Sequence, residues 1–218
     1  MIKSVIFDLD GTLLDTGLGV IATVKKMIKK FGYRELNQEE LETFIGPPVS
    51  LAVERLYGVS HEEAMEAMTY FRQEYPKGDI YKADYYEGLE ELLKDLLDKG
   101  YRVGVATYKR EDMAISLLED KGLAKYFDVI HGSNIAANLT KADVVKMTID
   151  DLGFSLDETV MIGDSDNDAI GADTAGVHFI GVTYGYGFRS LDAVAEYPNI
   201  GIAENPGQVL EIIENYNK

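Results

Sequence analysis

The stretch Val5–Asp15, VIFDLDGTLLD, places two carboxylates where an apolar run ends. The run Val5–Phe7 is continuously apolar, and Asp8 and Asp10 follow it with one residue between them. Short, continuous apolar runs are typical of parallel strands that are buried on both faces. Ligands of open α/β sheets bind beyond the carboxyl ends of such strands. This pair of carboxylates is therefore the first candidate for a functional site.

Composition limits the class of protein. The chain has 218 residues, of which 46% are hydrophobic, enough for one domain or for a core with a modest insertion. Cysteine is absent, which excludes disulfides, thiolate catalysis and cysteine metal sites and favours a reducing compartment. No signal peptide or membrane span is predicted, so we expect a cytoplasmic protein with no membrane partner.

The net charge also bears on the partners. A formal charge of −17 repels the phosphates of nucleic acids, so no nucleic-acid partner is expected. Most of this acidity is explained by solubility. An anionic substrate would need a local cation to neutralise its site. The sequence leaves the oligomeric state open.

The remaining apolar runs predict an α/β fold. Helical patterns that end in glycine, such as Leu89–Leu97 before Gly100, alternate with short runs rich in β-branched residues. This alternation favours a doubly wound parallel sheet. The predicted strands are Lys3–Phe7, Arg102–Ala106, Phe127–Ile130, Thr159–Ile162, Val177–Thr183 and Ile200–Ala203.

Residues 16–83 interrupt the alternation, because they contain helical patterns only. The predicted helices include Leu41–Ile45 and Val49–Tyr57. We therefore predict a small all-helical cap, residues 16–83, inserted after the first strand. The catalytic core would consist of residues 1–15 and 84–218.

Polar residues follow other predicted strands as well. Thr107 follows one of them, and GDSDND, Gly163–Asp168, follows another. Lys141 opens a predicted helix, because Thr140 can cap it and Asp143 completes a capping box. In that first turn the lysine charge and the helix amides both favour an anion.

Four carboxylates at one sheet edge repel each other, and a hard divalent cation such as Mg²⁺ relieves that repulsion. The metal, Lys141 and the Thr107 hydroxyl together would hold a phosphate group. One aspartate can then attack phosphorus to give an aspartyl phosphate. Another can protonate the leaving oxygen and later activate water.

These motifs resemble those of the haloacid dehalogenase superfamily of phosphatases, and the resemblance covers nearly the whole chain. The first motif, DxDGT, stands at Asp8–Thr12, and the fourth, GDSxND, at Gly163–Asp168. The second and third motifs correspond to Thr107 and Lys141. The first and fourth are specific, whereas the other two are supported by their positions.

The resemblance implies a role for each aspartate. Asp8 would be the nucleophile and Asp10 the acid/base. Mg²⁺ would be bound by the Asp8 side chain, the Asp10 backbone carbonyl and Asp164, with Asp168 as outer support. Asp166 is expected to be a solvated loop residue rather than a ligand.

The resemblance also implies a Mg²⁺-dependent phosphoric monoester hydrolase that acts on a small phosphorylated metabolite. The helical insertion and the stretches Phe44–Ser50 and Gly181–Phe188 resemble phosphoglycolate phosphatase-like members. Gly163 disfavours the sugar-phosphate mutases, which usually have Glu there. Tyr108 and Ala142 depart from the Asn and Pro that are frequent in the family. A 5'-nucleotidase, a pyrophosphatase, a sugar-phosphate mutase and a non-catalytic phosphate-binding regulator remain alternatives.

Substrate-binding residues are expected near the catalytic motifs and in the cap. Lys109 and Arg72 could reach a second anionic group, and the Gly-Pro-Pro of Phe44–Ser50 suggests a specificity loop. The candidate substrate-binding residues are Gly11, Thr12, Tyr108, Lys109, Gly46 and Arg72.

Two other motifs are weaker alternatives. A calcium loop starting at Asp164 would need Gly and Glu where Ala169 and Ala175 stand. Gly17–Ala22 fits a dinucleotide fingerprint, but Asp10–Thr16 separates it from the strand. We expect Gly17–Ala22 to be the flexible start of the cap.

Overall fold

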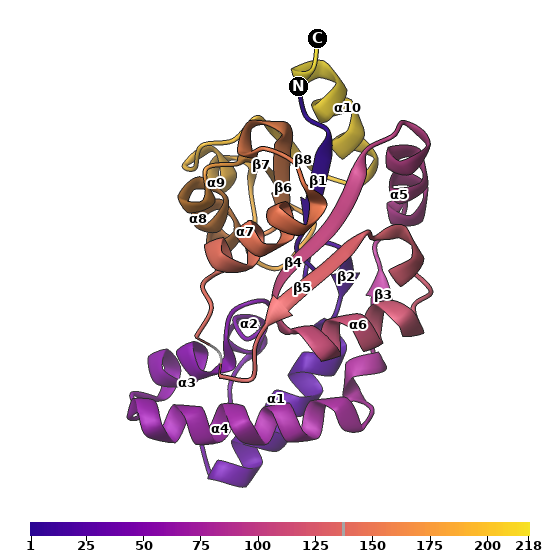
Figure 1. The fold of residues 1–218 in the computed structure, drawn as a ribbon. Helices are drawn as coiled ribbons and strands as arrows, with labels where there is room; N and C mark the ends of the chain where they lie inside the picture. Colours follow the sequence, from indigo (N-terminus) through magenta and orange to yellow (C-terminus); the bar gives the residue numbers. More distant parts are fainter. Residues whose placement is uncertain (137) are drawn as a thin grey trace.

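The computed structural model describes residues 1–136 and 138–218. Within these residues a six-stranded sheet has the order β5-β4-β1-β6-β7-β8, and all neighbouring strands are parallel (Figure 1). The doubly wound parallel sheet predicted from the sequence is confirmed. The strands are β1 Ser4–Phe7, β4 Arg102–Arg110, β5 Val129–Ser133, β6 Thr159–Gly163, β7 His178–Val182 and β8 Gly201–Ala203.

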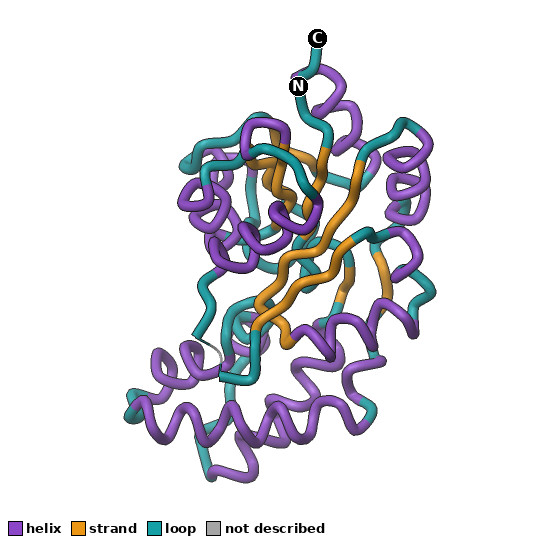
Figure 2. Tube along the Cα trace, viewed as in Figure 1, coloured by secondary structure: helices purple, strands orange, loops and turns teal. Residues whose placement is uncertain are grey.

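Helices cover both faces of this sheet, as the alternation of helix and strand along the chain requires (Figure 2). Val5 and Phe7 of β1 pack into the core on one face, while Ile6 packs into a separate core on the other. The first face is covered by α5 Leu89–Asp98, α6 Glu111–Asp120 and α10 Gly207–Tyr216, and the second by α7 Lys141–Leu152, α8 Asp166–Ala175 and α9 Leu191–Ala195.

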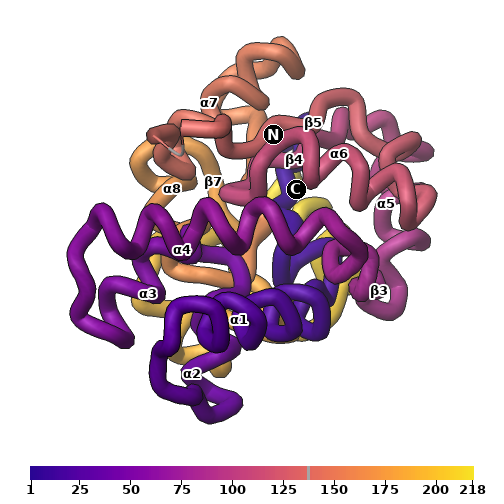
Figure 3. The backbone as a smooth tube through the Cα atoms, turned by 90° about the horizontal axis from the view of Figure 1, so that it is seen from below, coloured from indigo at the N-terminus to yellow at the C-terminus, as the bar shows by residue number. Residues whose placement is uncertain are grey.

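A second group of helices lies beyond the carboxyl ends of the strands (Figures 1 and 3). The longest two, α1 and α4, run alongside each other, and α3 packs against α4. We call this group the cap; its extent as a domain, residues 16–83, stays a prediction. Its elements are α1 Gly17–Phe31, α2 Gln38–Glu42, α3 Val49–Tyr57, α4 His61–Glu74, and the 3₁₀ turns η1 Tyr75–Lys77 and η2 Asp79–Tyr81.

The chain passes from the sheet to the cap and back through two segments, and these segments pair as short antiparallel strands that the sequence did not predict. Strand β2, Leu14–Asp15, pairs with β3, Asp84–Tyr85. Two residues are too few to show any periodicity. The remaining elements are the 3₁₀ turns η3 Ala124–Tyr126 and η4 Leu156–Glu158.

Three local predictions were wrong. The helix expected at Leu41–Ile45 lies at Gln38–Glu42, because Asn37 and Glu40 form a capping box that starts it earlier. Strand β4 continues past Thr107 to Arg110, with a register shift between these two residues. Gly17–Ala22 is not a flexible segment but the beginning of α1.

No helix in residues 1–136 and 138–218 is long and apolar enough to cross a bilayer.

Candidate active site

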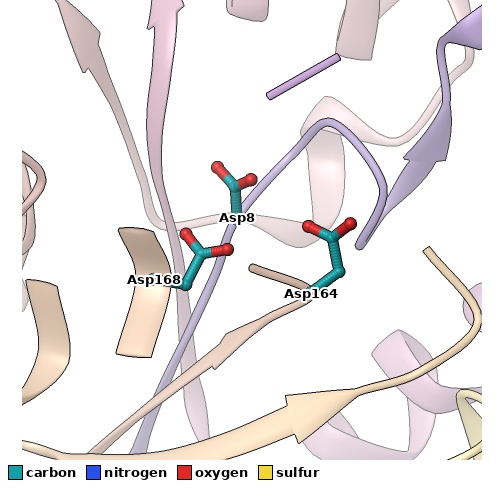
Figure 4. Close-up of side chains that lie close together, drawn as sticks. All are labelled: Asp8, Asp164 and Asp168. Carbon is teal, nitrogen blue, oxygen red and sulfur yellow. The ribbon is translucent and has the colours of Figure 1, made fainter. Parts of the chain in front are cut away.

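Three carboxylates meet at the carboxyl edge of the sheet (Figure 4). Asp8 follows β1, Asp164 follows β6, and Asp168 lies in the first turn of α8. One oxygen of each lies within 4.8 Å of the others. All three residues are buried, with exposed fractions of 4%, 3% and 1%. The alternating order of the strands brings together residues that are more than 150 positions apart in the sequence.

Lys141 is the cation of this cluster. Its Nζ donates a 2.6 Å hydrogen bond to Asp8 Oδ1 and lies 2.7 Å from Asp168 Oδ1 as an ion pair. The Thr140–Asp143 capping box predicted from the sequence is present and begins α7 at Lys141. The lysine side chain crosses Gly171 of α8, where a Cβ atom would lie 2.6 Å from Lys141 Cγ. A glycine at this position therefore leaves room for the lysine.

Backbone amides hold Asp164. Its Oδ2 accepts hydrogen bonds from the N–H groups of Tyr186 at 2.7 Å and Gly187 at 3.0 Å. Gly11, at a φ of +86°, packs so closely that a Cβ would lie 2.3 Å from Asp164 Oδ2, and Gly185 is equally close. The glycines of the first motif and of the loop after β7 thus allow the backbone to surround this carboxylate.

The charge of the cluster is not balanced by the side chains alone. Burial raises the pKa of Asp8 to about 7, although Lys141 lowers it, and Asp168 and Asp10 raise it further. Burial and the charges of Asp168 and Asp8 raise the pKa of Asp164 to about 8. Burial alone would lower the pKa of Lys141, but Asp168 and Asp8 raise it, so the lysine stays charged.

The cluster fits a hard divalent cation. The Lys141 ammonium pairs with Asp8 and Asp168, while Asp164 is held by backbone amides alone among the described residues. Asp168 Oδ1 makes no hydrogen bond among the described residues. Carboxylate oxygens are the ligands that Mg²⁺ and Ca²⁺ prefer. A divalent cation would offset the repulsion that raises the pKa values of Asp8 and Asp164.

Asp10 is not part of this cluster and lines a cavity together with residues of the cap. Its Oδ1 accepts a 2.6 Å hydrogen bond from Thr16 and lies 2.9 Å from Lys109 Nζ. Lys109 is itself buried, and its ammonium lies 4.9 Å from the centroid of the Tyr75 ring. The two aspartates of the first motif therefore have different surroundings.

Thr107, the residue of the second motif, and its neighbour Tyr108 lie in β4, and Tyr108 contacts the first residue of α7. Thr107 is buried and its hydroxyl accepts the amide of Lys109 at 3.2 Å. Tyr108, where the family often has Asn, accepts the amide of Lys141 through its hydroxyl at 3.1 Å. Its ring also lies 5.5 Å from Lys141 Nζ. Tyr108 thus supports the lysine that contacts Asp8.

The cavity has a volume of about 80 Å³. Four of the six candidate substrate-binding residues, Gly46, Arg72, Tyr108 and Lys109, line it together with Asp10. The other two do not: Gly11 packs on Asp164, and the hydroxyl of Thr12 is buried without a hydrogen bond. The structure adds lining residues that the sequence analysis did not propose, among them Met68, Arg110 and Ser133.

The model of the haloacid dehalogenase-like hydrolase family matches residues 5–182. The chain belongs to this family. A 5'-nucleotidase of Pseudomonas aeruginosa is 32% identical over 98% of the chain and 96% of its own length. A phosphoglycolate phosphatase of Agrobacterium fabrum is 32% identical over 83% of the chain and 80% of its own length.

Among solved structures of this fold, a predicted phosphatase from Clostridium acetobutylicum superposes with a TM-score of 0.90 at 33% identity. The match covers 98% of this chain and 100% of that one. The sequence predictions of a haloacid dehalogenase-like fold and of a phosphoric monoester hydrolase are confirmed.

Proposed function

We propose that the chain is a Mg²⁺-dependent phosphatase that hydrolyses a small phosphorylated metabolite through an aspartyl phosphate on Asp8. The observation that carries this proposal is the separation of Asp8 and Asp10. Asp8 contacts Lys141 and lies close to Asp164 and Asp168, whereas Asp10 lines the cavity and pairs with Lys109. This difference supports a nucleophilic role for Asp8 and a proton-transfer role for Asp10.

The Asp8 side chain, the Asp10 backbone carbonyl and Asp164 would hold Mg²⁺, with Asp168 outside them. When bound, Mg²⁺ supplies positive charge against the carboxylates and the phosphoryl oxygens. Lys141 adds a second positive charge at Asp8. Thr107 is proposed to contact the phosphoryl group.

In the first step an oxygen of Asp8 forms a bond to phosphorus, and the bond from phosphorus to the ester oxygen breaks. Asp10 gives its proton to the leaving oxygen. In the second step water attacks phosphorus, its proton returns to Asp10, and the bond from Asp8 to phosphorus breaks. Inorganic phosphate and the alcohol are the products.

Phosphoglycolate is the leading substrate. Phosphoglycolate phosphatases are among the relatives, and the cavity is small. Its volume of about 80 Å³ is roughly half that of a 150 Å³ cavity known to hold benzene, so this arrangement of cap and core has little room for a nucleobase. Nucleoside 5'-monophosphates remain the second candidate, because the 5'-nucleotidase matches nearly the full chain.

A mutase is disfavoured by the packing of Gly163. A Cβ at this position would lie 2.3 Å from the Cβ of Asp168, so a larger residue would displace that aspartate. Product analysis separates the two reactions, since a mutase returns an isomer without free phosphate.

The test is phosphate release from phosphoglycolate, nucleoside 5'-monophosphates and pyrophosphate, with Mg²⁺ and with EDTA. We expect release that needs Mg²⁺ and that Asp8→Asn abolishes. Borohydride reduction of enzyme quenched during turnover, followed by mass spectrometry of the Asp8 peptide, would detect the aspartyl phosphate, because an acyl phosphate is reduced to the alcohol and a free carboxylate is not. Full activity of Asp8→Asn would disprove the mechanism, and a rate on phosphoglycolate no better than on an aryl phosphate would disprove the substrate.

A further inference from the structure

The cap lines the cavity from α1, from the segment Phe44–Val49 and from α4 with the turn that follows it. Arg72 of α4 and Tyr75, the first residue of η1, are three positions apart and both line the cavity. Residues at this spacing lie on one side of a helix. Asp10 and Lys109 line the same cavity from the core. Polar groups of the cap and the proposed acid/base thus line the same cavity.

Arg72 has no acidic partner. It is half-buried and forms no ion pair with any described residue, although the chain has 38 acidic residues against 21 basic ones. Among the described residues it makes one hydrogen bond, from Nη1 to the backbone oxygen of Ile135, at 2.9 Å. Nearby, Arg110 is paired with Asp112 through two hydrogen bonds. Burial and the charge of Arg110 lower the pKa of Arg72.

Tyr75 carries a second unused polar group. The residue is 1% exposed, and its hydroxyl makes no hydrogen bond among the described residues. The Lys109 ammonium lies close to this hydroxyl, but an ammonium can only donate and cannot accept the proton of the hydroxyl. Buried hydroxyls normally have a partner, because leaving one unsatisfied is costly. A ligand in the cavity would supply the missing acceptor.

The other two cations of the cavity lining already have acidic partners. The core lysine of the cavity is held by Asp10, and Arg110 is held by Asp112. Most of the remaining lining is apolar: Val20, Phe44, Val49, Met68, Phe71, Met113 and Leu139. Two further hydroxyls line the cavity: that of Ser133 donates to the backbone oxygen of Asn134, and that of Tyr108 accepts the amide of Lys141. The cation without an acidic partner among the described lining residues is Arg72, and the Tyr75 hydroxyl lies three positions along the chain from it.

We infer that Arg72 and Tyr75 form a subsite for a carboxylate group of the substrate. The enzyme would then select small phosphorylated carboxylic acids. A carboxylate fits because the guanidinium fork binds it through two parallel hydrogen bonds, and because the small cavity limits bulk. This inference rests on the proposed function and extends it from a reaction to a substrate class.

The test compares two substrates that differ only at the subsite. One is 2-phosphoglycolate, and the other is 2-hydroxyethyl phosphate, in which CH₂OH replaces the carboxylate. The variants are Arg72→Met and Tyr75→Phe, with Arg55→Met as the matched control. Arg55 is exposed on α3 and does not line the cavity, so Arg55→Met removes the same charge from the cap.

We expect Arg72→Met to lower kcat/KM for 2-phosphoglycolate by about 30-fold or more, and Tyr75→Phe by about 10-fold, mainly through KM. Values for 2-hydroxyethyl phosphate should change by less than about 3-fold, and Arg55→Met should match the wild type. An equal loss on both substrates, or no loss, would overturn the subsite. A wild type that prefers pyrophosphate, with Arg72→Met reducing that preference, would assign the subsite to a second phosphate and overturn the carboxylate.

A binding measurement separates this inference from the proposed function. Calorimetric titration of the inactive Asp8→Asn variant with 2-phosphoglycolate, with and without Arg72→Met, needs no turnover. Weaker binding in the double variant supports the subsite even if the wild type hydrolyses no ester. Equal binding in both disproves the subsite, whatever the wild type hydrolyses.

Discussion

Lys109 Nζ lies 2.9 Å from Asp10 Oδ1, and both side chains are almost fully buried. Such a pair is held tightly, because either charge alone would be costly in the interior. Thr16 adds a 2.6 Å hydrogen bond to the same oxygen. Lys109 therefore fixes the direction in which the proposed acid/base faces the cavity.

Lys109→Met should lower kcat by about 10- to 100-fold, because a misplaced general acid loses part of its usual contribution. Steady-state kinetics on 2-phosphoglycolate measure the change. Lys77→Met is the control, since Lys77 is exposed and pairs only with Glu74. An unchanged kcat in Lys109→Met would show that the pair is not needed to place Asp10.

Gly171 tests the placement of Lys141. A methyl group there would lie 2.6 Å from Lys141 Cγ, so Gly171→Ala should move the ammonium away from Asp8. We expect kcat to fall by about 10-fold or more, because the electrostatic contribution of a positioned charge depends on its geometry. Gly207→Ala, at the start of α10, meets nothing closer than 3.3 Å and should leave kcat unchanged. Equal activity of both variants would contradict the packing argument.

Metal binding should stabilise the fold more at high pH than at low pH. The pKa of Asp8 is raised to about 7 and that of Asp164 to about 8. Between about pH 4 and pH 8 the metal-free native state therefore holds protons that the unfolded state has released, and stability falls as pH rises. A divalent cation offsets this loss, because it binds the ionised carboxylates.

We expect 5 mM Mg²⁺ to raise Tm by about 5 °C at pH 8 and by less than half of that at pH 5. Thermal unfolding with Mg²⁺ and with EDTA, at matched ionic strength, measures this. Asp164→Asn should remove most of the effect at pH 8. A shift that is equal at both pH values would argue against carboxylate ligands.

The sequence predicted the sheet well because its strands are continuous apolar runs, a pattern that does not depend on tertiary contacts. It misplaced α2, although the capping box of Asn37 and Glu40 was present in the sequence. The pair β2–β3 could not be predicted, since two residues carry no period and the pairing joins Leu14 to Tyr85 across the whole cap.

The candidate site likewise contains residues that the sequence could predict and residues that only the fold reveals. Asp8, Asp164 and Lys141 were recognisable because they follow strands or open a helix, and those positions share one edge of the sheet. The amides of Tyr186 and Gly187 were not, because every residue has an amide and only the fold selects which ones reach Asp164. Tyr75 could have been noticed from its three-residue spacing to Arg72.

The last prediction concerns the contact between η2 and α1 within the cap. Asp79, in η2, is 5% exposed and accepts hydrogen bonds from Lys26 at 2.6 Å, Lys82 at 2.8 Å and Thr23 at 2.9 Å. Burial alone would raise the pKa of Asp79, but these donors lower it to about 2. Ionised Asp79 therefore stabilises the fold above about pH 4, and this stabilisation is lost as pH falls toward 2.

The shift from 3.8 to about 2 corresponds to about 2 kcal/mol of folding free energy near neutral pH. Asp79→Asn should lower the free energy of unfolding by about this amount at pH 6, and by clearly less at pH 3, in urea unfolding followed by circular dichroism. Asp150→Asn is the control, because Asp150 is exposed on α7 and forms no ion pair with any described residue. A deficit of Asp79→Asn that stays constant from pH 6 to pH 3 would mean that packing, rather than the charge of Asp79, holds η2 against α1.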